Sequence, residues 1–350
     1  MININQNQSI RAKAPVLAIL LLTLFAACVH DYPTMTADGE EGVDPTLVQV
    51  NTEVTLDLEL VPLEIITNKA RSGTTKAAAD TYRRRFIIDA YHDGKVAQRQ
   101  VTVLENAEGS GSDKLTLPIT LKLHALEYTL AVWTDYVAAG TEADLYYNTE
   151  DLQQVSCTTP YTGNTPYRDC LYGTAPLDLR EYRDEWNAKV QVQVDMVRPL
   201  AQYELVATDV DYFLAKTKKQ RAAGETFTIT CSYSYFFPTV FDVLSGKPCD
   251  LRPDVSFTAP LILPDDGAPE CTVATDYIFA NGSESSAALS IEIHDSGGKV
   301  LSRIQDIQIP YRRGHITTLR GHFLTTGMEG GIVIDPDYGG DIEVDLDNLQ

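Results

Sequence analysis

Cys28 is the residue whose surroundings most clearly predict a chemical modification. It follows an uncharged apolar run over residues 14–27, and that run follows Arg11 and Lys13. A helix needs about 20 apolar residues to cross a bilayer, so this run is too short to do so. The basic start, the short apolar run and two small residues before the cysteine predict a secretory signal peptide over residues 1–27.

A cysteine placed directly after such a signal matches a bacterial lipobox, in which the thiol is acylated and the chain is cut before the cysteine. Phe25 stands where leucine is more usual, and an ordinary signal peptide with a chance cysteine is the alternative. More than one acyl chain would hold the mature N-terminus stably in a membrane. Residues 31–45 are acidic and contain Pro and Gly, so we expect residues 28–45 to form a lipidated flexible tether.

The remaining cysteines suggest a disulfide and argue against a metal site. They stand at positions 157, 170, 231, 249 and 271. A bond between Cys157 and Cys170 would close the turn-rich loop CTTPYTGNTPYRDC, as an exported protein permits. Because five is odd, at least one thiol stays free or pairs elsewhere. No CxxC spacing occurs and the six histidines are scattered, so we expect no metal site.

Motifs of known enzyme classes are absent from the sequence. We find no GxSxG, HExxH or P-loop, and no GxGxxG after a strand. Asp335 and Asp337 begin a stretch that resembles a calcium loop, but Gly339 and Leu346 stand where ligands are needed. We therefore expect no enzyme and no cofactor. A hydrolase would need two carboxylates converging in a cleft, which no pattern here singles out.

The composition limits the partners and the number of domains. The chain has 350 residues, with 28 Lys plus Arg and 49 Asp plus Glu, for a net charge of −21. Loss of the signal peptide leaves 26 cations against 49 acids, or −23. Such an acidic surface repels phosphates, so we expect no nucleic acid partner. About 320 mature residues correspond to two domains of ordinary size.

Alternating apolar and polar residues predict β-strands along most of the chain. The first is a long strand over residues 46–66. Asp93–Gly94 and Gly297–Gly298 are typical turns of β-hairpins. Residues 208–219 form the one clear helical pattern, with a cap at its start and lysines at its end.

These elements predict an all-β chain of two sandwich domains with one or two short helices. Alternation restarts at residue 188, so we place the N-terminal domain at residues 46–187 and the C-terminal domain at residues 188–350.

Aromatic and basic side chains offer two further candidates. Trp133 and Tyr136 could stack on sugars, but a tryptophan in an alternating strand more commonly packs in a core, and we favour the core for Trp133. Arg83 and Arg85 share a strand face, for which we expect a solvated surface or pairing with neighbouring acids rather than an anion site.

Several stretches taken together resemble one family. They are YTLAVWTDYV, DLYYNTEDLQQV, VRPLAQYELVATDVDYFL and QDIQIPYRRGHITTLRGHFLTT. These stretches are similar to the fimbrillin-related lipoproteins of Bacteroidales, which include minor and anchor subunits of type V pili. The family's C-terminal pattern is matched between Ile309 and Thr325, with YRRGH where an asparagine is common. The resemblance covers roughly residues 46–345.

The resemblance implies two transthyretin-like (Greek-key) β-sandwich domains and subunits that join by donor-strand exchange. In such joining, a neighbour's extended segment fills the groove of a sandwich that lacks a strand. In polymerising members an arginine-specific protease removes the first strand, and Arg71 occupies a comparable place after strand 46–66. An ordinary exposed loop arginine is the simpler interpretation of Arg71. The C-terminal strand around residues 332–344 is a candidate donor or groove edge.

The sequence thus leads to one principal hypothesis and one alternative. The principal hypothesis is a lipoprotein of the cell outer membrane, exposed at the surface, that acts as an anchor or accessory subunit of a fimbrium. Its partners would be fimbrial subunits of the same pilus and the membrane that holds the lipid on Cys28. The alternative is a surface lipoprotein that binds glycans through exposed Trp and Tyr side chains.

Overall fold

The computed structural model describes residues 48–58, 81–104, 119–185, 188–264, 268–325 and 342–345. Within these ranges most residues lie in β-strands and the α-helices are short, which confirms the all-β prediction. None of the described helices has the length and apolarity needed to span a bilayer.

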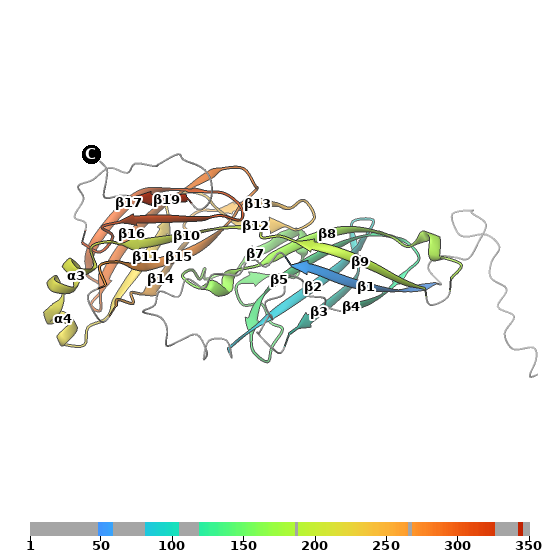
Figure 1. Cartoon of the computed structure of the whole chain (residues 1–350), viewed down its shortest axis with the longest axis horizontal. Helices are drawn as coiled ribbons and strands as arrows, with labels where there is room; N and C mark the ends of the chain where they lie inside the picture. Colours follow the sequence, from blue (N-terminus) through green and yellow to red (C-terminus); the bar gives the residue numbers. More distant parts are fainter. Residues whose placement is uncertain are drawn as a thin grey trace, which may run out of the picture.

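The first sandwich consists of two sheets packed face to face (Figure 1). One sheet has the order β4-β1-β9, with β1 (Gln49–Leu58), β4 (Ile119–His124) and β9 (Lys189–Met196). The other has the order β3-β2-β5-β8, with the strands β2 (Tyr82–His92), β3 (Lys95–Val103), β5 (Glu127–Ala138) and β8 (Leu171–Asp178).

The second sandwich also has two sheets. The first has the order β15-β10-β18-β19, with the strands β10 (Leu200–Ala207), β15 (Cys271–Phe279), β18 (Ile316–Gly321) and β19 (Ile342–Asp345). The second has the order β14-β11-β16-β17, with the strands β11 (Phe227–Tyr233), β14 (Ser256–Pro260), β16 (Ser285–Asp295) and β17 (Val300–Tyr311).

The two sandwiches repeat one topology. In each, the first strand lies between an antiparallel and a parallel neighbour: β1 between β4 and β9, and β10 between β15 and β18. The sheet β3-β2-β5-β8 corresponds strand for strand to β14-β11-β16-β17. The second sandwich differs by one added strand, because β19 pairs in parallel with the outer side of β18.

A small sheet joins the two sandwiches. It has the order β13-β12-β7-β6 and combines β6 (Tyr147–Asn148) and β7 (Val155–Cys157) with β12 (Phe237–Asp242) and β13 (Lys247–Arg252). The 3-10 turns η3 (Leu152–Gln154) and η4 (Pro166–Arg168) flank β7, and η5 (Arg180–Tyr182) follows β8. Each sandwich contributes one insertion to this sheet, so the sheet ties the two domains together.

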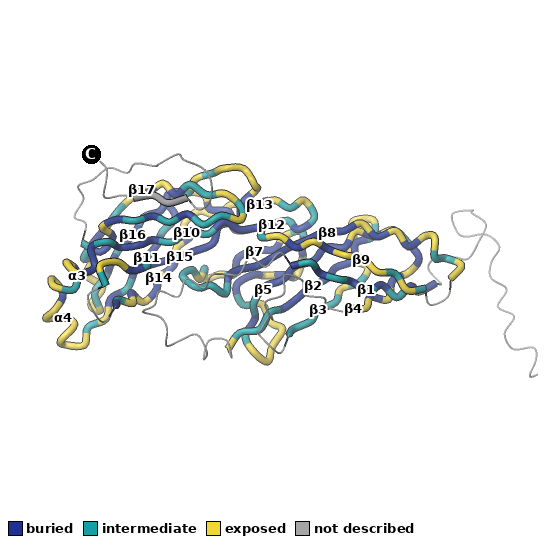
Figure 2. The backbone as a smooth tube through the Cα atoms, viewed as in Figure 1, coloured by how far each residue is buried: buried dark blue, intermediate teal, exposed yellow. Residues whose placement is uncertain are grey.

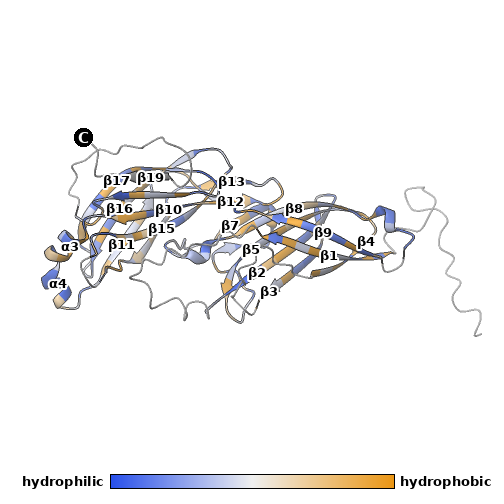
Figure 3. Cartoon of the chain, in the orientation of Figure 1, coloured by the Kyte–Doolittle hydropathy of each residue, from blue (hydrophilic) through white to orange (hydrophobic). Residues whose placement is uncertain are grey.

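The alternating sequence pattern fills the cores as expected. Along β1, every second residue from Val50 to Leu58 is buried and the residues between are partly exposed. The strands β4, β11, β14 and β18 show the same alternation, whereas β2, β5 and β12 are buried over continuous runs, and Figures 2 and 3 show burial and hydropathy along the chain. Each sandwich has its own apolar cluster, and a third cluster lies where they meet.

One domain boundary differs from the sequence-based prediction. The strand Lys189–Met196, which we expected to open the C-terminal domain, pairs with β1 over eight residues and buries Val194 and Met196 in the first sandwich. The N-terminal domain therefore extends to about residue 197 rather than residue 187. Alternation identifies a strand but not its partner, and this partner lies more than 130 residues earlier in the chain.

The predicted turns are present, while the predicted helix is divided. Asp93 and Gly94 both have positive φ angles and join β2 to β3, as a tight hairpin requires. The segment 208–219 forms α3 (Val210–Lys216) and the start of α4 (Lys218–Ala222), separated at Thr217. Asp209 precedes α3 but makes no capping bond. Its carboxylate instead accepts hydrogen bonds from the backbone of Leu324 and Thr325.

Candidate functional site

The strand β1 is held on both sides within its sheet. It pairs antiparallel with β4 from Gln49 to Val54 and in parallel with β9 from Asn51 to Leu58. Its departure would leave two facing strand edges with unpaired backbone donors and acceptors, separated by the width of one strand.

The inward side chains of β1 supply much of the core of the first sandwich. Val50, Val54, Leu56 and Leu58 are each fully buried, and Thr52 lies among them. Full burial of such side chains contributes about 1.5–3 kcal/mol each, or about 6–12 kcal/mol for the four apolar residues. A strand that replaced β1 would therefore need apolar residues at alternate positions.

The strand β19 is bound less extensively than β1. Among the described residues it pairs with β18 alone, in parallel, from Thr317 with Ile342 to Arg320 with Asp345. Its sequence alternates apolar and acidic residues. Among the described strands β19 thus lies at an edge of the second sandwich, and it overlaps the end of segment 332–344, which the sequence marks as a candidate donor.

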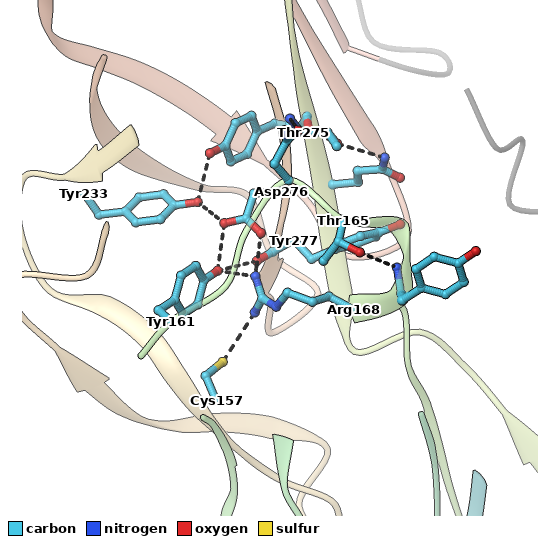
Figure 4. Close-up of polar contacts among 12 residues, drawn as sticks. Cys157, Tyr161, Thr165, Arg168, Tyr233, Thr275, Asp276 and Tyr277 are labelled. Carbon is cyan, nitrogen blue, oxygen red and sulfur yellow. Dashed lines mark hydrogen bonds and ion pairs between the residues drawn. The ribbon is translucent and has the colours of Figure 1, made fainter. Parts of the chain in front are cut away.

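A buried polar cluster lies between the two sandwiches (Figure 4). The guanidinium of Arg168, from η4, donates to the carboxylate of Asp276, from β15, with an N–O distance of 2.5 Å. Tyr161 and Tyr233 each donate a hydroxyl hydrogen bond of 2.7 Å to the same carboxylate. Arg168 is 2% exposed and Asp276 is fully buried. The cluster therefore joins the loop after β7 to the core of the second sandwich.

The environment of this cluster keeps its tyrosines protonated. Burial raises the pKa of Tyr161 and of Tyr233 well above the ordinary value, so both hydroxyls remain hydrogen-bond donors. Burial also raises the pKa of Cys157, whose sulfur lies 3.4 Å from a guanidinium nitrogen of Arg168. A protonated, buried thiol is a poor nucleophile. These contacts fix the geometry between domains and do not form an activated catalytic group.

The predicted bond between Cys157 and Cys170 is absent from the structure. Both are free, buried thiols. The loop between them does not close on itself, because Tyr161 and Arg168 reach into the second sandwich. The sulfur of Cys157 instead lies 3.4 Å from a guanidinium nitrogen of Arg168.

Trp133 lies in the core, as we favoured from the sequence. It is fully buried and contacts Tyr147, Phe241 and Phe279, with ring centroids 5.4, 6.3 and 6.5 Å away. It is therefore not available to stack on a sugar, which removes the residue on which the glycan alternative depended.

Arg85 pairs with acids rather than forming a solvated surface. Its guanidinium binds both oxygens of Asp135, at 2.9 and 2.7 Å, and also contacts Asp144. Burial raises the pKa of Asp135, and the two-point contact with Arg85 opposes that effect. Arg84 lies over the ring of Tyr136, 4.6 Å from its centroid. The basic stretch around these residues is thus part of the packing of the first sandwich.

Several sequence-based candidates lie outside the described residues. These are the lipidation site Cys28, the cleavage candidate Arg71 and most of the tail that begins at Asp335. Within the described residues, no group of three or more acidic, histidine or cysteine side chains is arranged to hold a metal ion. No sequence pattern singled out Asp276 as a buried polar residue. The only indication for Arg168 was that it is the single arginine in the turn-rich loop between Cys157 and Cys170.

Comparison with known proteins places the chain in a family. The sequence model of a family of unknown function, DUF6562, matches residues 45–349. The chain belongs to this family. No curated protein sequence matches it significantly.

Solved structures similar to this DUF6562 protein come from Bacteroidales. The fimbrial anchor protein Mfa2 from Porphyromonas gingivalis has 11% identity and a TM-score of 0.38, over 73% of this chain and 82% of that chain. A proposed cell adhesion protein from Bacteroides eggerthii has 12% identity and a TM-score of 0.39, over 86% and 98%.

A proposed polysaccharide-binding protein from Bacteroides thetaiotaomicron has 10% identity and a TM-score of 0.37, over 74% of this chain and 80% of that chain. The neighbours thus include a fimbrial protein, the class that the sequence resembles.

Proposed function

We propose that this DUF6562 protein is a structural component of a surface fimbrium and joins its neighbours by β-strand exchange. The donor is the C-terminal segment that contains β19. The acceptor is the position of β1 in the first sandwich of the next subunit. The role is structural rather than catalytic.

The observation that carries this proposal is the parallel pairing of β19 with β18. By the repeated topology, β18 corresponds to β9, and β9 pairs in parallel with β1. In its own chain, β19 lies parallel to β18, the last strand of the repeated topology in the second sandwich. In the position of β1 of another subunit, it would likewise lie parallel to β9, the last strand of the first sandwich. Its alternating sequence suits a strand with one face toward a core.

The energetic balance favours exchange once β1 has gone. In the part of its own chain that the structure describes, β19 pairs with one neighbour, β18. In the vacated groove it would pair with both β4 and β9 and cover the apolar side chains that β1 normally buries. The gain in hydrogen bonds and burial is the driving force for joining subunits.

Two sequence features support a surface location and a switch in role. The lipobox at Cys28 would anchor the uncut chain in the outer membrane, since acylated chains insert in lipid. Cleavage after Arg71 would release the lipid together with β1. An uncut subunit therefore serves as an anchor, and a cut subunit serves as part of the filament.

The test is intact mass and N-terminal analysis of the protein from outer membranes and from sheared surface filaments. The proposal expects acylated Cys28 on membrane-bound chains, and an N-terminus at Ser72 on chains within filaments. An Arg71→Ala variant should keep its lipid and stay out of filaments, while Arg83→Ala serves as a nearby control. The absence of the protein from filaments, together with an unmodified Cys28, would exclude the fimbrial role.

A further inference from the structure

The two short helices at the far end of the second sandwich carry an unusual concentration of positive charge. The helices and the turn after them, residues 210–224, contain four cations and one acid, Asp211, in a chain where acids outnumber cations 49 to 28. The cations are Lys216, Lys218, Lys219 and Arg221, and all four are exposed. None of them takes part in the salt bridges between described residues. We call this surface the basic tip.

The basic tip is a fixed platform rather than a loose loop. Val210, Phe213 and Thr217 are buried beneath it, and Phe213 packs edge-on against Phe227 with ring centroids 5.2 Å apart. The hydroxyl of Thr217 donates to the carbonyl of Phe213, which secures the junction between α3 and α4. The cations therefore project from a backbone that the core holds in place.

An exposed aromatic ring lies on the same helix as the first of these cations. Tyr212 is 64% exposed, one of the most exposed large side chains among the described residues. Tyr212 and Lys216 are four residues apart on α3, so they lie on one face of the helix. An aromatic face beside a cation suits a ligand that has both an apolar ring face and a negative charge.

The position of the basic tip favours a ligand outside the cell over the membrane that holds the chain. The helices α3 and α4 lie at one end of the elongated molecule, and the chain enters β1 at the opposite end (Figure 1). A tether that precedes β1 therefore holds the molecule by the end away from the tip.

From these observations we propose that the basic tip binds acidic polysaccharide. The cations contact the carboxylate or sulfate groups of the polysaccharide, and the ring of Tyr212 stacks on one of its sugar rings. The net charge of −21 repels a polyanion from the rest of the surface. Binding is therefore confined to the tip and depends strongly on salt, as for other polyanions that release counterions. This site is separate from the buried Trp133 and from the strands used in subunit joining.

The test measures binding of the unlipidated mature chain to polygalacturonate and to heparin, with neutral dextran as a third probe. We expect binding to at least one polyanion and none to dextran, with affinity falling as sodium chloride rises from about 50 to 300 mM. The triple variant Lys218→Gln, Lys219→Gln, Arg221→Gln should lose at least tenfold in affinity, or about 1.4 kcal/mol. The variant Tyr212→Ala should bind the polyanion with about fivefold lower affinity at any one salt concentration.

A matched control removes the same charge elsewhere. Lys95, Lys122 and Lys299 are also exposed, and their replacement by Gln should leave the affinity unchanged. Equal losses in the two triple variants would show a non-specific charge effect and overturn the proposal. Failure to bind either polyanion would overturn it as well. Concentration-dependent self-association that only the tip variant abolishes would identify a second copy of the chain as the partner instead.

Discussion

At the scale of single residues, the pair Arg168 and Asp276 explains how two charges persist between the domains. Burial of a charge is costly unless hydrogen bonds replace the lost water. Asp276 accepts from the guanidinium and from the hydroxyls of Tyr161 and Tyr233, so both of its oxygens are used. Removal of one partner would leave the other charge buried without compensation.

We therefore expect Arg168→Met to lower the free energy of unfolding by about 3–5 kcal/mol, the usual effect of breaking a buried ion pair. Urea denaturation measures this change. The control is Arg303→Met, which breaks the partly exposed pair of Arg303 with Glu292 and should cost about 0–1 kcal/mol. Similar losses in the two variants would contradict the role assigned to the buried pair.

Asp89 provides a second residue-scale prediction, because its carboxylate is buried with only one cationic neighbour. Its Oδ1 lies 2.9 Å from Nε of Arg99, without the alignment of a hydrogen bond. Desolvation raises the pKa of Asp89 from 3.8 to about 6, more than Arg99 lowers it, and nearby Asp151 adds to the rise. The folded chain thus binds this proton more tightly than the unfolded chain does.

Because the folded chain binds the proton of Asp89 more tightly, protonation of Asp89 stabilises the fold. This stabilisation is greatest below about pH 4 and is lost as the pH rises to about 6. Asp89→Asn should remove that slope and raise stability at pH 7 by about 1 kcal/mol, allowing for solvent around Arg99. Thermal unfolding of both proteins from pH 4 to 7 measures the slope of stability against pH and the difference at pH 7. Asp93→Asn, at an exposed turn on the same hairpin, should keep the slope. A stability curve in Asp89→Asn that still falls over this range would contradict the assignment.

At the scale of elements, β1 is the strand that the proposed exchange would remove from the first sandwich. Asn51 of β1 lies opposite Lys122 of β4, and both side chains are at least partly exposed. A covalent link between these two strands would keep β1 in place after any cut in the following segment. Exchange at this position would then be blocked.

We expect a disulfide between Asn51→Cys and Lys122→Cys, in a Cys249→Ser background, to prevent filament growth until a reductant is added. The exposed Cys249 is removed to avoid mispairing. A control disulfide joins positions 292 and 303, which face each other in the second sandwich, and should not affect growth. Filaments that grow normally with the β1 disulfide intact would contradict exchange at β1. Electron microscopy and gel mobility report the outcome.

At the scale of the whole molecule, the third apolar cluster makes the two sandwiches depend on each other. It combines Ile87 and Trp133 of the first sandwich with Leu200 and Phe279 of the second. The joining sheet β13-β12-β7-β6 adds main-chain hydrogen bonds across the same region. A buried apolar interface of this kind couples the unfolding of the domains it joins.

We therefore expect the mature chain to unfold in one calorimetric transition, with equal calorimetric and van't Hoff enthalpies. Phe241 lies at the centre of this cluster, with ring centroids 4.8 Å from Tyr172 and 5.4 Å from Phe279. Phe241→Ala should cost about 3–5 kcal/mol and divide the unfolding into two transitions. Two transitions in the unmodified chain would show that the domains are independent.

The sequence by itself determined the strands, their inward faces, the tight hairpins and the burial of Trp133. These features follow from local alternation and turn chemistry, which act over a few residues. The carboxylate of Asp209, which binds the backbone of Leu324 and Thr325 rather than capping the helix, depended on distant packing.

Only the tertiary structure decided which strands pair and that Cys157 and Cys170 are free thiols. Lys189–Met196 joins the first sandwich because β1 offers it a parallel edge, and the sulfur of Cys157 lies beside the guanidinium of Arg168, which pairs with Asp276. These contacts join residues far apart in the chain, and side-chain type alone does not specify a partner across that separation. Local pattern therefore fixed the elements, while non-local pairing fixed the domain boundary and the polar cluster between the sandwiches.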